Sequence, residues 1–273
     1  MRGAAGSRVR VLLAQLCPVP GDAAANAERV ADVVAAHPAT DLAVFPELFL
    51  QGYDLASAPL LALEPDAAEI ARVRRAAAET GTAILVGYAE RGPAGVLYNS
   101  LAAIDEAGRL VATYRKIQLF GDERDVFEPG HQLFVVPLAG RQIGLLLCFD
   151  AEFPEPARAL ATAGAEVLVT AAANMDPYHA DHELATRARA LDNRRPHVYV
   201  NRVGTEAGLR FVGGSRVVAA DGSVQMQCAD QDEELSITVV ELCEESDEAV
   251  QYLAQVPLRL PVRLIDSVPG GST

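Results

Sequence analysis

The stretch Gly144-Leu-Leu-Leu-Cys148-Phe-Asp150 carries the clearest structural signal in this chain. Its apolar run predicts a buried strand, and a cysteine closes that strand. Taken alone, Cys148 has an ordinary explanation, because free cysteine is commonly a small core residue.

Two other apolar stretches are also interrupted by a polar residue. Ala43-Val-Phe-Pro-Glu47 places a carboxylate directly after a strand, and Tyr114-Arg-Lys116 places a lysine in an otherwise apolar segment. If these residues meet Cys148 at the carboxyl ends of strands, they supply a base, a cation and a nucleophile. Spacing along the chain does not prove that they meet.

The surrounding sequence alternates strand-like and helix-like segments. The first predicted helix starts after Gly21-Asp22, and its buried stripe consists of Ala23, Ala27, Val30 and Val34. The second starts near Asp66, which caps it, and ends at Gly81. Its buried face consists of Ile70, Val73 and Ala77. Later helices are Pro154–Ala163 and His179–Asp192, the latter with Leu184, Ala188 and Leu191 inward. Predicted strands are Val9–Leu16, Asp41–Phe45, Ala83–Ala89, Tyr98–Asp105, Leu110–Arg115, Leu133–Pro137, Gln142–Leu147, Val167–Ala171, His197–Val203, Phe211–Ala219 and Leu235–Glu241.

Strands outnumber helices, which favours two sheets packed face to face with helices outside. With 273 residues, 50% of them hydrophobic, we expect one globular domain over 1–273 with a mobile tail from about residue 266. The net charge of −14 argues against a nucleic-acid partner. No apolar run approaches the length of a membrane span, and the four cysteines form no C-x-x-C pair, so we expect a soluble cytoplasmic protein.

Three blocks together resemble the signatures of the nitrilase (carbon–nitrogen hydrolase) superfamily. They are Phe45-Pro-Glu47-Leu-Phe-Leu-Gln-Gly52-Tyr53, Tyr114-Arg-Lys116 and Leu147-Cys148-Phe-Asp150-Ala-Glu-Phe-Pro154-Glu. Weaker matches run from Leu12 to the strand near Leu235, so the resemblance covers nearly the whole chain.

This resemblance implies an α/β fold, a four-layer α-β-β-α sandwich of two mixed sheets. It also implies Glu47 as general base, Lys116 as oxyanion stabiliser and Cys148 as nucleophile, with no metal or organic cofactor. A second glutamate is expected in the loop 122–128, where Glu123 fits best and Asp125 and Glu128 remain open. By family position, the residues expected near the substrate are Tyr53, Phe120, Phe149, Asn174 and Met175. A homodimer is expected on the same ground.

The chain has no tryptophan, and Cys148-Phe-Asp150 replaces the Cys-Trp-Glu usual in nitrile-hydrolysing relatives. This favours amide hydrolysis, and the sequence looks most like simple aliphatic amidases such as 5-aminopentanamidase and stereoselective amidases. N-carbamoyl amide hydrolases and ω-amidases remain open.

Three alternatives use other features. His179 and His182 sit three apart on a predicted helix and suggest a metal site, although no third ligand is evident. A thiol protease would pair Cys148 with His179 or His197. A catalytically silent binding or scaffold protein is a third hypothesis, which the presence of Glu47, Lys116 and Cys148 together disfavours.

Overall fold

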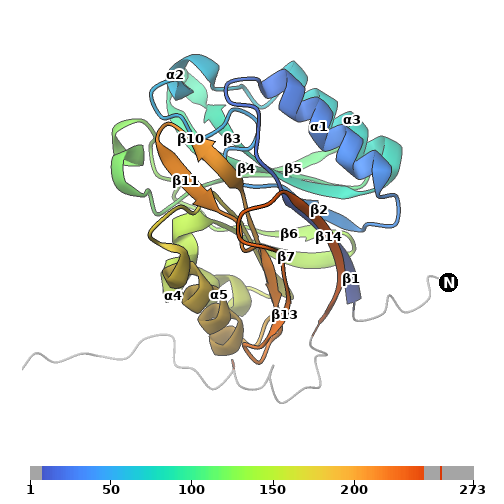
Figure 1. Ribbon diagram of the computed structural model, residues 1–273. Coiled ribbons are helices and arrows are strands. Elements are labelled where there is room, and N and C mark those ends of the chain that lie inside the picture. The colour runs from blue at the N-terminus through green and yellow to red at the C-terminus, as the bar shows by residue number, and fades with distance from the viewer. Residues whose placement is uncertain (1–7, 243–252, 254–273) are drawn as a thin grey trace, which may run out of the picture.

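Two six-stranded sheets pack against each other, and helices cover their outer faces in the computed structural model (Figure 1), which describes residues 8–242 and residue 253. This confirms the α-β-β-α sandwich predicted from the sequence. The predicted mobile tail lies outside the described residues.

The first sheet is mixed, because β1, β2 and β3 run parallel while the other neighbouring pairs are antiparallel. Its spatial order is β14 (Glu234–Glu241), β1 (Arg8–Gln15), β2 (Leu42–Val44), β3 (Ala83–Arg91), β4 (Leu97–Ile104) and β5 (Leu110–Arg115).

The second sheet repeats this arrangement, with β7, β8 and β9 parallel. Its order is β13 (Val224–Gln227), β12 (Arg216–Val218), β9 (His197–Asn201), β8 (Val167–Ala172), β7 (Arg141–Leu147) and β6 (Val135–Leu138). A separate hairpin consists of β10 (Val203–Glu206) and β11 (Leu209–Val212).

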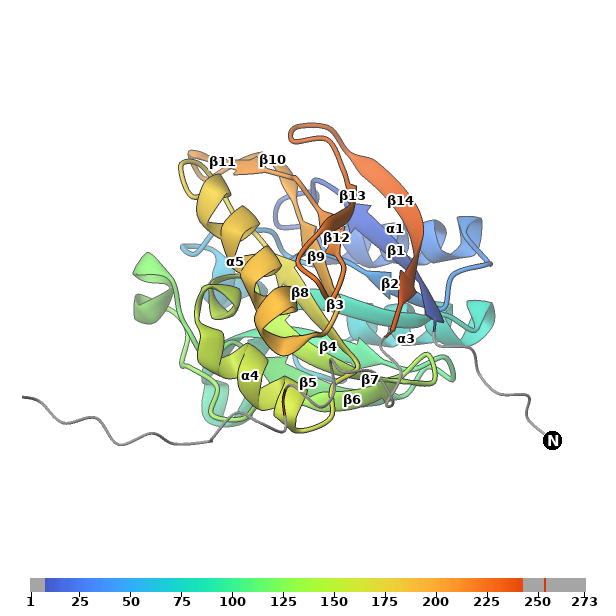
Figure 2. The same ribbon diagram turned by 90° about the horizontal axis from the view of Figure 1, so that it is seen from below.

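Helices α1 (Ala23–Ala36) and α3 (Ala68–Thr80) lie together on the first sheet, and α4 (Pro154–Thr162) and α5 (His179–Asn193) lie together on the second (Figures 1 and 2). The short helix α2 spans Ala58–Leu61, and single turns of 3₁₀ helix span Pro93–Gly95, Gly121–Asp125 and Cys148–Glu152. No helix among the described residues is long and apolar enough to cross a bilayer.

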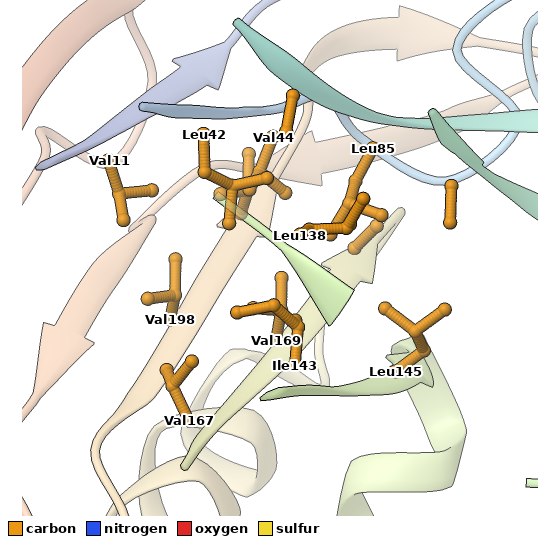
Figure 3. Close-up of a cluster of buried hydrophobic side chains, with 14 of the residues drawn as sticks. Val11, Leu42, Val44, Leu85, Leu138, Ile143, Leu145, Val167, Val169 and Val198 are labelled. Atoms are coloured by element: carbon orange, nitrogen blue, oxygen red, sulfur yellow. The ribbon is translucent and has the colours of Figure 1, made fainter. Parts of the chain in front are cut away.

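The core explains why the central strands are apolar on both faces. In β1, Val11 and Leu13 face the second sheet, while Leu12 and Ala14 face α1 and α3. Figure 3 shows the space between the sheets filled by branched side chains from both, including Val44 opposite Val169. Each such fully buried side chain contributes roughly 1.5–3 kcal/mol through removal of apolar surface from water.

Local capping residues explain where α1 begins and where α3 ends, but not where α3 begins. Asp22 caps α1, because its side chain accepts a hydrogen bond from the Ala25 N–H at 2.9 Å. Helix α3 ends at Gly81, whose φ of +69° suits glycine. The cap predicted for Asp66 is wrong, since α3 begins at Ala68 and Ala67 occupies the cap position.

The predicted inward face of α5 is also wrong. Leu184 and Leu191 are 71% and 41% exposed, and Ala188 is half-buried. Polar and small residues form the buried stripe instead, among them His182 and Thr186. The prediction turned the apolar side chains of this helix toward the core. The structure buries the polar side chains instead, because these find hydrogen-bond partners inside the protein.

The strand predicted at Phe211–Ala219 is divided into β11 and β12. Gly213 and Gly214 separate the two, with φ of +61° and +66°. These left-handed conformations bend the chain away from the hairpin and into the second sheet. Strand β13 and helix α2 were not predicted.

Candidate active site

The three polar residues that interrupt apolar stretches of the sequence follow three different strands. Lys116 comes directly after β5 and Cys148 directly after β7, while Glu47 lies three residues beyond β2. The next parallel strand, β8, is followed by Ala173 and Asn174. The carboxyl ends of strands from both sheets therefore form one site.

Lys116 lies between two buried carboxylates. Its Nζ donates to Glu47 Oε1 at 2.6 Å and lies 2.9 Å from Glu123, and all three side chains have no exposed surface. Burial alone would lower the pKa of Lys116, but the two carboxylates outweigh it and raise the pKa well above its usual value. Lys116 is thus a permanent cation, and it is the single lysine of the chain.

The two oxygens of Glu47 have different neighbours. Oε1 accepts from Lys116 and from Asn99 Nδ2 at 2.7 Å, whereas Oε2 accepts from the Ala173 N–H at 2.8 Å. The Ala173 N–H also lies near the Cys148 sulfur and lowers the pKa of this thiol. Oε2 is therefore the oxygen on the side of the thiol.

Cys148 occupies a turn rather than the strand itself. Its φ of +44° lies in the left-handed region, which turns the chain sharply from β7 into the 3₁₀ turn. Cys148 is 7% exposed, and burial followed by the Glu47 carboxylate raises the pKa of its thiol well above the usual value. Lys116 lowers this pKa, but the burial and the carboxylates prevail. The resting sulfur is protonated and needs a base.

The acidic loop contributes Glu123 to this cluster. Its Oε1 accepts from the Tyr53 hydroxyl at 2.6 Å, and its Oε2 accepts from the Phe120 N–H at 2.9 Å. Burial, opposed in part by Lys116, raises the pKa of Glu123. The other two candidates of this loop, Asp125 and Glu128, are exposed.

The residues expected around the substrate divide into two groups. Phe120, Phe149, Asn174 and Met175 line a small pocket that contains the Cys148 sulfur, with about 230 Å³ of empty space including its mouth. Tyr53 is not among its lining residues and instead bonds to Glu123. The other lining residues are Glu152, Ala173, Tyr178 and His182.

Two supporting residues were missed in the sequence. Asn99 donates through Nδ2 to Glu47 and, at 3.3 Å, to Glu123. Asp150 accepts from the Tyr114 hydroxyl at 2.6 Å and from the Gln118 N–H at 2.8 Å, so it joins the cysteine turn to the lysine segment. Burial raises the pKa of Asp150 to about 6. A polar residue inside the apolar strand Leu97–Ile104 was the available signal for Asn99.

The histidines do not take the places that the alternative hypotheses need. His179 Nε2 lies 3.9 Å from Glu183, and His197 is held between Thr170 and the Thr186 carbonyl. The described residues contain no group of three side chains that could hold a metal ion. The histidine that lies in the Cys148 pocket is His182, which the protease hypothesis did not consider.

Comparison with known proteins identifies the family. A family model described as Carbon-nitrogen hydrolase matches residues 10–245. The chain belongs to the carbon–nitrogen hydrolase family. This carbon–nitrogen hydrolase is 37% identical to an (R)-stereoselective amidase of a Pseudomonas species, covering 86% of this chain and 85% of the relative. It is 31% identical to a probable nitrilase of Schizosaccharomyces pombe, covering 85% and 89%.

Solved structures point to the same branch. The NitN amidase of Nesterenkonia sp. AN1 resembles this carbon–nitrogen hydrolase with a TM-score of 0.80 and 30% identity, covering 91% of this chain and 96% of that one. A variant of the Nesterenkonia amidase carries the acetamide moiety of fluoroacetamide covalently added at its active-site cysteine. The present chain is thus an amidase-type hydrolase of the nitrilase superfamily.

Proposed function

We propose that this hydrolase converts a small aliphatic amide to its carboxylic acid and ammonia through a thioester on Cys148. The observation that carries the proposal is the position of the Ala173 N–H, which donates to Glu47 Oε2 and also lowers the pKa of the nearby Cys148 thiol. It brings a carboxylate to a buried thiol whose pKa is raised, which is the arrangement that general-base activation of the sulfur requires.

In the first half-reaction, the Cys148 sulfur bonds to the amide carbon while Glu47 Oε2 accepts the thiol proton. Collapse of the tetrahedral intermediate breaks the carbon–nitrogen bond, and Glu47 returns the proton to the leaving nitrogen as ammonia departs. Water then loses a proton to Glu47 and attacks the thioester. The carbon–sulfur bond then breaks, the acid is released, and Glu47 returns the proton to the sulfur.

Lys116 and the N–H of Phe149 stabilise the oxyanion of the intermediate. Loss of one such donor typically costs roughly 3–4 kcal/mol of barrier lowering. Lys116 suits this role because its flanking carboxylates keep it charged at all physiological pH values. Glu123 supports Lys116 as its second carboxylate partner, at 2.9 Å.

The test is ammonia release from a panel of small amides, with carbamoyl compounds and dicarboxylic acid monoamides included to test the N-carbamoyl and ω-amidase alternatives. Cys148→Ala is expected to abolish release with little change in melting temperature. Cys228→Ala is the matched control, because Cys228 is also buried but lies outside the pocket. Activity that survives in Cys148→Ala, or a wild-type protein inert on the whole panel, contradicts the proposal.

We also propose that the protein is a homodimer formed through α5. Leu184 and Leu191 lie seven residues apart on this helix and expose large apolar side chains that a second copy would cover. Light scattering on Leu184→Glu tests this assembly. A wild-type protein of monomer mass refutes it.

A further inference from the structure

The segment that follows β8 carries the N–H on which the proposed base depends. Ala173 donates its N–H to Glu47 Oε2 at 2.8 Å, and the carbonyl of the preceding residue, Ala172, accepts from the Glu47 N–H at 3.4 Å. The next residue, Asn174, lines the Cys148 pocket. The direction of this one main-chain segment therefore sets both the position of the base and one wall of the pocket.

Asn201, the last residue of β9, holds this segment through its side chain. Its Oδ1 accepts from the Asn174 N–H at 2.7 Å, and its Nδ2 donates to the Asn174 carbonyl at 3.2 Å and to the Gly213 carbonyl at 2.9 Å. Asn201 has no exposed surface. A primary amide suits this position because it presents an acceptor and a donor in one plane, and so bonds to both main-chain groups of a single residue.

The main chain of Asn201 is fixed by further buried residues. Ser215 Oγ accepts from the Asn201 N–H at 2.9 Å and donates to the Asn201 carbonyl at 3.2 Å. The Ser215 N–H in turn donates at 2.9 Å to Oε1 of Gln15, which ends β1 in the other sheet. All three residues have no exposed surface. Strand ends of both sheets therefore hold the Asn201 amide in one place.

We propose that Asn201 is a positioning residue for the general base and acts through the Ala173 N–H. The inference rests on the proposed function and adds a residue that its mechanism requires. Without the Asn201 oxygen, the Asn174 N–H is buried with no acceptor, which is costly enough that the peptide must turn to find another partner. This rotation moves the adjoining Ala173 N–H away from Glu47 Oε2.

The pocket wall depends less on Asn201 than the base does. The Asn174 carbonyl also accepts from the Val212 N–H at 3.2 Å, and Asn174 Nδ2 donates to the Tyr178 carbonyl at 3.1 Å. Both bonds remain when the Asn201 side chain is removed. Substitution of Asn201 should therefore lower kcat much more than it changes KM.

The first test is the kinetics of Asn201→Ala on the best amide of the panel. Its kcat is expected to fall about tenfold to a hundredfold, because a displacement of about 1 Å at a reacting group can cost a hundredfold. Its KM should change less than about threefold, since uniform binding of the substrate is retained. A wild-type kcat, or a change in KM as large as the change in kcat, overturns the inference.

The second test measures activation of the sulfur without any amide turnover. Iodoacetamide alkylates Cys148, and mass spectrometry follows the rate. Because Glu47 takes the thiol proton in this reaction too, the rate in Asn201→Ala should fall about tenfold or more. A wild-type alkylation rate in this variant overturns the inference.

Asn26→Ala is the matched control, because Asn26 makes the same set of bonds elsewhere. It is fully buried in α1, its Oδ1 accepts from the Val19 N–H at 2.8 Å, and its Nδ2 donates to the Val19 and Leu50 carbonyls at 2.8 and 2.9 Å. Both variants should lose melting temperature to a similar extent, whereas Asn26→Ala should keep the wild-type kcat and alkylation rate. An equal loss of kcat in the two variants reflects general destabilisation and overturns the inference.

A conservative variant restores the acceptor in a side chain of the same size. In Asn201→Asp, burial against two carbonyls raises the pKa of the new carboxyl, which then accepts from the Asn174 N–H and donates its proton to one carbonyl. Alkylation of Cys148 in Asn201→Asp should therefore stay within about threefold of the wild-type rate, well inside the range that loss of a general base covers. A rate more than about tenfold below the wild type overturns the inference, also if Asn201→Ala does not fold.

Alkylation separates this inference from the amidase proposal. If Asn201→Ala slows alkylation of Cys148 but the wild-type protein hydrolyses no amide, the amidase proposal fails and the positioning role of Asn201 stands. If the wild-type protein hydrolyses amides and Asn201→Ala keeps its kcat, the positioning role fails and the amidase proposal stands.

Discussion

Replacing Lys116 by methionine removes the cation that separates two buried carboxylates. Glu47 and Glu123 lose a partner at 2.6 and 2.9 Å, and neither side chain has any exposed surface through which water could compensate. Asn99 continues to donate to both, but it carries no charge. At neutral pH, at least one carboxylate must then take up a proton or remain buried with its charge unpaired.

The expected cost follows from that uncompensated charge. Removing one partner of a buried ion pair typically destabilises a protein by about 3–5 kcal/mol, against a total stability of about 5–15 kcal/mol for ordinary domains. Glu123→Gln in the Lys116→Met background removes one of the two stranded charges. The double variant should therefore recover part of the loss, with a coupling energy of about 1–3 kcal/mol.

Urea unfolding at pH 7 measures these free energies. The matched control is Arg8→Met, because Arg8 pairs with Glu241 at 2.9 Å on the surface and should contribute no more than about 1 kcal/mol. In Lys116→Met the carboxylate pKa values rise above their unfolded values, so the deficit should be absent below about pH 4 and grow as the pH rises. A loss no larger than that of Arg8→Met, or a deficit independent of pH, refutes this account.

Two further perturbations test other parts of the structure. Burial lowers the pKa of His197 from 6.5 to about 4, so its contribution of about 3 kcal/mol is present above pH 6.5 and lost as the pH falls toward 4. His197→Gln should reduce this dependence of the free energy of unfolding on pH, whereas replacement of the exposed His131 by glutamine should not. If the free energy of unfolding depends on pH equally in both variants, His197 is not the source of the acid dependence. Asn99→Ala removes the amide donor that, beside Lys116, holds Glu47 Oε1 and Glu123, so kcat should fall about tenfold to a hundredfold with KM little changed. Wild-type kcat in this variant would show that Asn99 does not position the base.

The strands and the chemical groups were predictable because their signals are local. The part of a strand that is buried on both faces must be apolar, as Val11–Ala14 of β1 and Ile143–Leu147 of β7 are, so a polar residue at its end stands out in the sequence. Glu47, Lys116 and Cys148 were all found in this way. The order of the three matching blocks also predicted the sandwich and the family.

Other features depend on contacts between distant segments. Asn99 donates across 52 positions to Glu47, and the N–H that orients Glu47 belongs to Ala173, 126 positions away. Local patterns carry no information about such pairs, because they depend on which strand ends meet in the folded protein. The same reason left Glu123 undecided among three acidic residues until burial separated them.

By itself, the sequence determined which groups are available for chemistry and which strands carry them, since burial of apolar side chains leaves a pattern along the chain. The tertiary structure decided which of those groups carry a proton and which side chains lie next to them. A thiol enclosed with two carboxylates resists losing its proton, a lysine between them stays charged, and Glu152 joins His182 in the pocket wall. These properties arise from burial and the field of neighbouring charges, which exist only once the two sheets have packed together.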